Sequence, residues 1–228
     1  MRFLADALSA LNLLCGVGAI VAAAHGRLDL AMGLLLAGAG FDAFDGIAAR
    51  RFGGSRIGAL ADDIADGVTN GIAPGAALWF VVGGTEGVAL GTLFCAFTLA
   101  RLVFFTLNKG EDNAGFRGLP STAGAAIVLA GLVLFPESPA LIGLLTGSAC
   151  VLMTAFDARY RHLGRVVADS ARARGAVLAF LGALVLSAAI VGPWLAAAIL
   201  LAATLAYGLG PIGQNFRAAL VRRAARPA

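Results

Sequence analysis

Charged residues are scarce in this sequence. They make up 13% of its 228 residues, whereas hydrophobic residues make up 60%. Soluble domains carry roughly a quarter charged residues, and apolar runs long enough to cross a bilayer recur from one end of this chain to the other. The composition therefore excludes an ordinary soluble protein and predicts an all-α, polytopic transmembrane helical bundle.

Several other features are missing. The three cysteines, Cys15, Cys95 and Cys150, fall in apolar runs without metal-ligand spacing, so we expect small buried side chains. No basic residues interleave with aromatic residues in a polar segment, which argues against nucleic-acid binding, and the net charge of +4 suits an anionic lipid surface. The apolar stretch after Met1 lacks a small-residue cleavage pattern, so we expect it to be the first span and not a cleaved leader.

Eight apolar runs are candidate spans. Short gaps separate them, so neighbouring helices should be antiparallel within one compact bundle. Pro74 lies inside the third run and should kink it or end it early. Residues 1–210 would form a single transmembrane domain and residues 211–228 a basic tail. The expected spans are 7–24, 28–49, 57–81, 87–107, 119–135, 139–156, 174–191 and 193–210.

The basic residues indicate how the bundle is oriented. Fifteen of the seventeen lie at one set of helix ends or in the tail, whereas Arg27 lies at the opposite set and Arg101 lies within a span. Basic residues concentrate on the cytoplasmic side of membrane proteins. Both termini and the even-numbered loops are therefore expected in the cytoplasm. A six-span arrangement with both termini inside would satisfy the same bias.

Apart from Asp29 at the very start of the second span, five of the thirteen acidic residues lie in the second and third spans. A carboxylate in hydrocarbon costs roughly 2.5–3.5 kcal/mol even on a lenient insertion scale. These side chains must therefore pair with cations, bind metal or line a polar cavity. The five are Asp42, Asp45, Asp62, Asp63 and Asp66.

Helical spacing groups four of these carboxylates, because residues three or four positions apart share a helix face. The shared faces carry Asp42, Asp45, Gly46 and Ala49 on the second span and Gly58, Asp62 and Asp66 on the third. If the two faces meet, four carboxylates converge, which suits hard divalent cations with oxygen ligands. The small residues could instead serve close helix packing alone. Asp63 points about 100° away from Asp62, so its role stays open.

The same residues spell a longer pattern, Asp42-x-x-Asp45-Gly46-x-x-Ala49-Arg50, seven residues, then Gly58-x-x-x-Asp62-x-x-x-Asp66. This pattern resembles the signature of the CDP-alcohol phosphatidyltransferase family, with all eight fixed positions at the family's spacing. The resemblance implies two divalent cations, Mg²⁺ or Mn²⁺, held by the four aspartates, with Asp66 also the general base. It implies contacts to a CDP-activated lipid from Asp42, Asp45, Gly46, Ala49, Arg50, Gly58 and Asp62.

Segments outside the signature most resemble the bacterial phosphatidylserine synthases of this family. They are residues 11–16, 72–74, 100–102 and 118–121. The implied reaction transfers the phosphatidyl group of CDP-diacylglycerol to the hydroxyl of L-serine and releases CMP. Two positions depart from that group, since Asp63 stands where it usually has serine and Asn70-Gly71 where it usually has Phe-Gly. Both lie near the expected acceptor pocket, so glycerol 3-phosphate, inositol or inositol phosphate are alternative acceptors.

Arg101 is the one basic residue within a span. A buried arginine needs an anionic partner, which would be a substrate phosphate, the serine carboxylate or a structural carboxylate such as that of Asp63. Arg101, Asp63 and Asn70 are the candidate contacts to the acceptor or a phosphate. Asn12, Thr69 and Asn70 could line the pocket, but hydrogen bonding between helices is the more common role of such residues within spans.

The resemblance also predicts surroundings and partners. We expect a multi-pass protein of the cytoplasmic membrane, with the active site facing the cytoplasm, membrane lipids around it and a homodimer as in relatives. Six helices would form the catalytic core, and the last two would be additions. A cation-coupled transporter is the alternative from another class, because intramembrane aspartates can bind ions. The acids are concentrated in one helix pair, however, without the matching segment that an internal repeat would supply.

Overall fold

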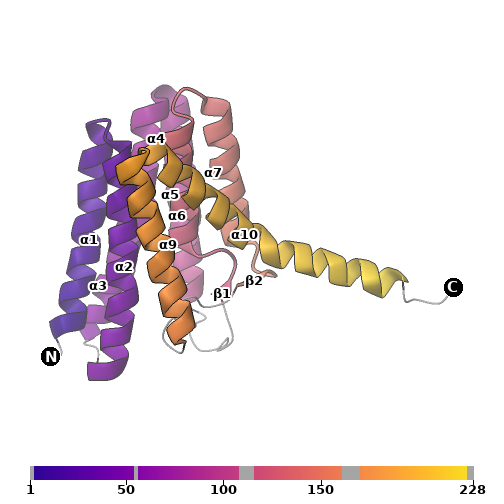
Figure 1. The fold of residues 1–228 in the computed structure, drawn as a ribbon, viewed down its shortest axis with the longest axis horizontal. Helices are drawn as coiled ribbons and strands as arrows, with labels where there is room; N and C mark the ends of the chain where they lie inside the picture. Colours follow the sequence, from indigo (N-terminus) through magenta and orange to yellow (C-terminus); the bar gives the residue numbers. More distant parts are fainter. Residues whose placement is uncertain (1–2, 54–55, 108–115, 161–169, 225–228) are drawn as a thin grey trace.

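The computed structural model describes residues 3–53, 56–107, 116–160 and 170–224, which are almost entirely helical (Figure 1). The predicted all-α architecture is thereby confirmed. The first half contains α1 (Phe3–Ala24), α2 (Leu28–Phe52), α3 (Arg56–Gly67), the π-helical turn η1 (Val68–Ile72), α4 (Ala73–Val82) and α5 (Gly84–Leu107). The second half contains β1 (Phe116–Arg117), α6 (Ser121–Leu134), α7 (Pro139–Thr154), β2 (Arg159–Tyr160), α9 (Ala171–Ile190) and α10 (Pro193–Ala224). The two short strands pair in antiparallel fashion.

Helical segments occupy all eight of the ranges expected from hydropathy. Among the described residues, 5 helices are long and apolar enough to cross a membrane, namely α1, α2, α5, α9 and α10. The helices α6 and α7 are apolar but shorter, and the third expected span is divided into α3, η1 and α4. Helix length and composition thus indicate a multi-pass membrane protein.

The last helix is longer than its apolar part. Its membrane-spanning stretch is Pro193–Pro211, close to the predicted span of 193–210, and the helix itself continues to Ala224. Hydropathy indicates where an apolar segment ends, whereas a helix ends only where its backbone hydrogen bonding ends. Figure 1 shows the C-terminal half of α10 projecting away from the bundle.

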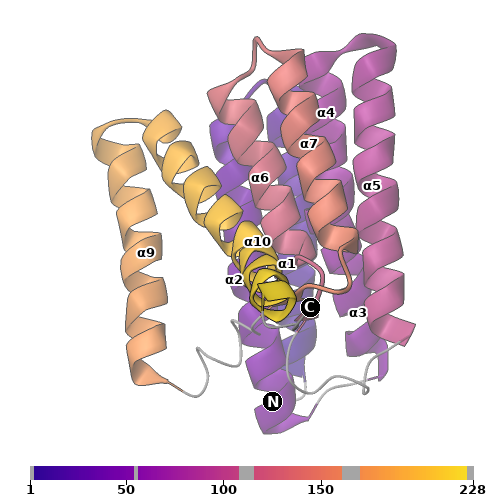
Figure 2. The ribbon, with the colours of Figure 1, turned by 90° about the vertical axis from the view of Figure 1, so that its right-hand side faces the viewer.

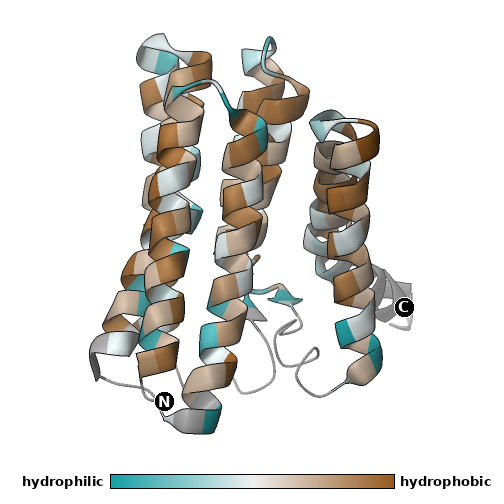
Figure 3. Ribbon diagram, turned by 60° about the vertical axis from the view of Figure 1, so that its left-hand side comes forward, coloured by the Kyte–Doolittle hydropathy of each residue, from teal (hydrophilic) through white to brown (hydrophobic). Residues whose placement is uncertain are grey.

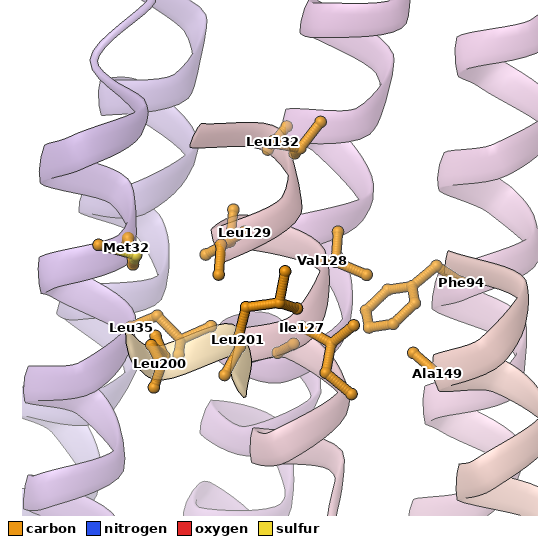
Figure 4. Packing of buried hydrophobic residues seen from close by; sticks show 14 of the residues in the cluster. Met32, Leu35, Phe94, Ile127, Val128, Leu129, Leu132, Ala149, Leu200 and Leu201 are labelled. Atoms are coloured by element: carbon orange, nitrogen blue, oxygen red, sulfur yellow. The ribbon is translucent and has the colours of Figure 1, made fainter. Parts of the chain in front are cut away.

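The helix α6 is the centre of the bundle. It packs against α2, α4, α7 and α10, and its side chains from Gly124 to Leu132 are all buried. In Figure 4, Ile127 and Leu129 of α6 lie among Leu35 of α2, Phe94 of α5 and residues of α10. The helix α6 is therefore held in place by neighbours on several sides.

The helix α9 is the most peripheral, and Figure 2 shows it on the outside of the bundle beside α10. Leu184 is its one buried residue, whereas Leu178, Val185 and Ile190 are exposed. Figure 3 shows apolar residues along the lengths of the helices and hydrophilic ones mostly near their ends. Such an exposed apolar surface is stable against lipid rather than water.

The π turn between α3 and α4 follows from Pro74. Proline has no N–H, and its ring clashes with the carbonyl of the residue four positions earlier, here Asn70. The chain widens by one residue at this point, so that the N–H of Ala73 donates to the carbonyl of Val68. A kink or an early end was expected at Pro74, but the chain instead stays helical through it with one π turn. Such π turns are frequent at functional sites.

Candidate active site

Three carboxylates meet between α2 and α3. Asp42 and Asp45 lie about one turn apart on α2, Asp62 lies on α3, and one oxygen of each lies within 4.8 Å of the others. Asp45 is buried and the other two are half-buried. Like charges this close repel strongly away from bulk water, so a bound cation would stabilise the group. Spacing along each helix places these residues on one face of that helix, and their convergence shows that the two faces are directed toward each other.

The donor set of this group fits a hard divalent cation. All three donors are carboxylate oxygens, which Mg²⁺ and Mn²⁺ prefer. The hydroxyl of Ser9 on α1 donates to Asp45 Oδ2 at 2.8 Å. Hydrogen bonds of this kind orient ligating carboxylates, so α1 supports the group from a third helix.

Asp66 lies about one turn beyond Asp62 on α3 and is not part of the three-carboxylate group. Its Oδ1 accepts two hydrogen bonds of 3.2 Å each, one from Asn12 Nδ2 on α1 and one from Asn70 Nδ2 on η1. Its charge interacts with Asp62 and with Arg101. The four motif aspartates thus comprise three converging carboxylates and a fourth that is held by two amides.

Arg101 of α5 is buried, with 4% of its surface exposed. Its Nη1 donates to Ser121 Oγ, at the first residue of α6, over 3.3 Å. Its charge also interacts with Asp66 and Tyr207. A buried guanidinium needs such compensation, and Asp66 supplies a carboxylate charge that interacts with it.

Asp63 faces a different part of the molecule. It lines an open groove of about 300 Å³ between α3, η1 and α5, together with apolar residues that include Val68, Ile72 and Leu99. A second hollow of about 240 Å³ shares Asp63 and Leu99 and continues along α5. Asp63 therefore lies apart from the three-carboxylate group, as its helical angle predicted.

Small residues flank the carboxylates on both helices. Gly46, Ala49 and Gly58 are each partly exposed, and each lies within about one helical turn of a motif aspartate. No large side chain at these positions covers the backbone beside the carboxylates. The side chain of Arg50, the remaining residue of the signature, lies outside the described residues.

Two residues of the site were not predicted from the sequence, Ser9 and Ser121. A weak signal existed for Ser9, because it lies three positions before Asn12 and so shares its helix face. Both side chains are buried. Ser121 lies in the segment 118–121 that resembles the family, but its contact with Arg101 depends on how α5 and α6 are placed relative to each other.

Known proteins resemble this chain in the region that builds the site. The sequence model described as CDP-alcohol phosphatidyltransferase matches residues 2–157. Two curated proteins named CDP-diacylglycerol–serine O-phosphatidyltransferase, from two strains of Helicobacter pylori, are 32% and 31% identical over 126 residues. Each alignment covers 53% of this chain and 53% of the relative, so the chain spans about half the length of these relatives. The resemblance expected from the signature is confirmed.

Proposed function

We propose, on the premise that this chain belongs to the CDP-alcohol phosphatidyltransferase family, that it transfers the phosphatidyl group of CDP-diacylglycerol to the hydroxyl of L-serine. The products would be phosphatidylserine and CMP. Family membership makes the chain an enzyme of this type, in place of a transporter. Serine as the acceptor is the finer proposal, which the names of two relatives support. The observation that carries the mechanism is the meeting of Asp42, Asp45 and Asp62 beside Asp66.

The four motif aspartates would hold two divalent cations, Mg²⁺ or Mn²⁺. Asp42, Asp45 and Asp62 supply the converging oxygens, and Asp66 would add Oδ2, because the two amide hydrogen bonds go to Oδ1. When bound, the cations neutralise the diphosphate of the lipid and the CMP leaving group. Ser9 would keep the Asp45 carboxylate oriented.

Asp66 would act as the general base. It takes the proton of the serine hydroxyl while that oxygen bonds to the phosphorus on the lipid side of the diphosphate. The bond from this phosphorus to the bridging oxygen breaks, and its electron pair leaves with CMP. A carboxylate beside cations is a weak base, so its position matters more than its basicity. Transfer is direct, without a covalent link between lipid and protein.

The CDP-lipid would lie along the faces of α2 and α3 that carry the small residues. Gly46, Ala49 and Gly58 leave room for the nucleotide to approach the helix backbones. Arg50, which follows on α2, would meet the phosphates or a motif aspartate, as the family signature implies.

The acceptor pocket would lie between Asp66, Asn70 and Arg101. The buried guanidinium of Arg101 suits the serine carboxylate. Asn70 Oδ1 is a buried oxygen without a hydrogen-bond partner among the described residues, which suits the serine ammonium group. Asp63 would meet the acceptor only from the groove beside α5, and it has the weakest support of the predicted acceptor contacts.

Glycerol 3-phosphate and inositol phosphate are the runner-up acceptors. Their phosphate would be held best by several cationic side chains. The cation whose charge interacts with Asp66 is Arg101, and it is the one buried cation of the described structure. A single buried guanidinium matches a carboxylate better than a phosphate, which favours serine. Inositol carries neither a phosphate nor a carboxylate, and the experiment below distinguishes it from serine as the acceptor.

The eight helical ranges would each cross the cytoplasmic membrane, with both termini in the cytoplasm. The basic residues at one set of helix ends support this orientation. Residues 1–210 would then form one transmembrane unit, in which α9 and α10 are additions to a six-helix core, with a basic tail after it. The site would open to the cytoplasm, and two copies would form a homodimer as the family resemblance implies.

The test is CMP release by the purified protein in detergent with CDP-diacylglycerol and Mg²⁺ or Mn²⁺. Serine, glycerol 3-phosphate, inositol and inositol phosphate are added one at a time. Release that depends on serine alone supports the proposal. Release that depends on a different alcohol keeps the transfer chemistry but contradicts the acceptor assignment at Asn70 and Arg101.

A further inference from the structure

Two buried asparagines on different helical segments hold the same oxygen of Asp66. Asn12 Nδ2 on α1 and Asn70 Nδ2 on η1 each lie 3.2 Å from Asp66 Oδ1. Asn12 is 1% exposed and Asn70 is 2% exposed. Both donors are therefore shielded from bulk water. We call this pair of side chains the amide clamp.

The carboxylate determines which way each amide points. An ionised carboxylate only accepts hydrogen bonds, so it must face the NH₂ group of each asparagine. The amide oxygens then point elsewhere, and neither Asn12 Oδ1 nor Asn70 Oδ1 has a hydrogen-bond partner among the described residues. Leaving buried acceptors unpaired reduces stability. Helix docking alone would not favour such a pair, so the bonds to Asp66 point to a functional purpose.

Neighbouring residues prevent Asn12 from turning away. Thr69, which precedes Asn70 in the π turn, donates its hydroxyl to the backbone carbonyl of Asn12 at 2.9 Å. Gly38 of α2 lies on the opposite side, where an added Cβ would be 2.7 Å from Asn12 Oδ1. Gly16 of α1 leaves the room that Thr69 occupies. Residues of α1, α2 and η1 thus fix the clamp in one geometry.

We propose that Asn12 and Asn70 are positioning residues, which fix the Asp66 carboxylate so that Oδ2, which would also face a cation, keeps one lone pair directed at the reacting hydroxyl. This inference rests on the proposed role of Asp66 as general base. Two donors on Oδ1 block rotation of the carboxylate, and a freely rotating carboxylate would spend less time in the reactive geometry. Asn12 is the better position for a test substitution, because its amide oxygen faces Gly38 and not the proposed acceptor pocket. Asn70 is also placed at that pocket, so a change there would affect two functions.

The primary variant is Asn12→Leu, which keeps the size of the side chain and removes one donor. At saturating substrates, its kcat for CMP release should fall about tenfold to hundredfold, because general-base catalysis contributes about 10²–10⁴-fold and misplacement loses part of it. The KM for CDP-diacylglycerol should stay within about twofold, since Asp42, Asp45 and Asp62 are untouched. The affinity for Mn²⁺ should fall less than in Asp42→Ala, because the variant only loosens Asp66 and removes no carboxylate. Asn70→Leu should lower kcat similarly and also raise the KM for serine.

The matched control is Thr69→Val. It removes the hydrogen bond from Thr69 to the Asn12 carbonyl, in the same turn, but leaves both amide donors on Asp66. Its loss of kcat should be clearly smaller than that of Asn12→Leu even where the two variants unfold at the same temperature. Equal kcat losses at equal stability would show that Asn12 matters only for packing and would overturn the inference.

A double-mutant cycle separates positioning from general damage. In an Asp66→Asn background, Asn12→Leu should cause little further loss of kcat, because residues that act through one group are not additive. A further loss as large as in the wild-type background would overturn the inference. Where Asn12→Leu fails to fold, Asn12→Ala carries the same expectation, since it too lacks the donor.

Failure of the clamp differs from failure of the proposed function. If Asp66→Asn is inactive while folded Asn12→Leu and Asn70→Leu turn over normally, the clamp is wrong and the general base stands. If Asp66→Asn turns over as fast as wild type, the general base is wrong and the clamp has nothing to position. Absence of CMP release from folded wild-type protein with every acceptor would contradict the proposed function itself.

Discussion

A single methyl group at Gly38 should disturb the site from the outside. The residue lies on α2, opposite the amide of Asn12, and the atoms nearest to an added Cβ belong to Asn12, Thr69 and Cys15 and not to Asp66. In Gly38→Ala, the new Cβ would lie 2.7 Å from Asn12 Oδ1, 3.0 Å from Thr69 Cγ2 and 3.3 Å from Cys15 Cβ. Because carbon–oxygen contacts are comfortable at about 3.3–3.6 Å, Asn12 or α2 has to move.

The size of the effect follows from how little the neighbours can yield. Asn12 is buried and is held by Asp66 and Thr69, so the strain cannot be relieved by moving into solvent. Overpacking of this kind lowers the free energy of unfolding by about 1–3 kcal/mol. A shift of Asn12 also moves its donor on Asp66, and kcat should fall by about tenfold or more.

Gly40→Ala is the matched control, two residues further along α2, where nothing lies within 4 Å of an added Cβ. Both variants gain helix propensity of about 0.5–1 kcal/mol, so this gain cancels in the comparison. The free energy of unfolding is measured in detergent by denaturant titration, and kcat by CMP release per folded protein. Equal stability and equal kcat for the two variants would refute the packing of α2 against Asn12.

Three further variants test separate parts of the structure. Asp66→Asn should lose most of the transfer activity, about 10²-fold or more, yet stay folded and still bind the CDP-lipid; normal turnover would contradict its role as base. Asp42→Ala should weaken binding of Mn²⁺, measured by titration calorimetry, because it removes one oxygen of the three-carboxylate group; unchanged affinity would count against the site. Tyr160→Phe should lower the free energy of unfolding by about 1 kcal/mol, because Tyr160 loses its 2.7 Å hydrogen bond to the Gly208 carbonyl. Thermal unfolding in detergent checks this last variant, and unchanged stability would show that the contact between β2 and α10 contributes nothing.

The sequence was sufficient to predict the helices and most of the motif. Apolar runs set where helices can lie, and residue spacing places Asp42 and Asp45 on one face of α2 and Asp62 and Asp66 on one face of α3. These are local properties of one or two helices. The convergence also needs α2 and α3 to be held beside each other, and both helices pack against α1.

Features that depend on how helices align with one another could not be predicted. Nothing in the spacing of α3 shows that Asp66 is held by amides from α1 and η1, because that depends on the depth at which α1 crosses. The contact of Arg101 with Ser121 likewise needs the relative placement of α5 and α6. The π turn was indicated only as a disturbance at Pro74, since a kink, a stop and a widened turn all relieve the same clash.

Transfer of a phosphatidyl group to serine is tested most directly by following isotopically labelled L-serine into lipid. Purified protein is incubated with CDP-diacylglycerol, Mn²⁺ and the labelled amino acid, and CMP and lipid products are quantified by mass spectrometry against an Asp66→Asn blank. Labelled phosphatidylserine that forms in equal amount to CMP, and is absent from the blank, is the expected result. CMP release without any labelled lipid would contradict serine as the substrate. So would a lipid product that contains another acceptor and no label.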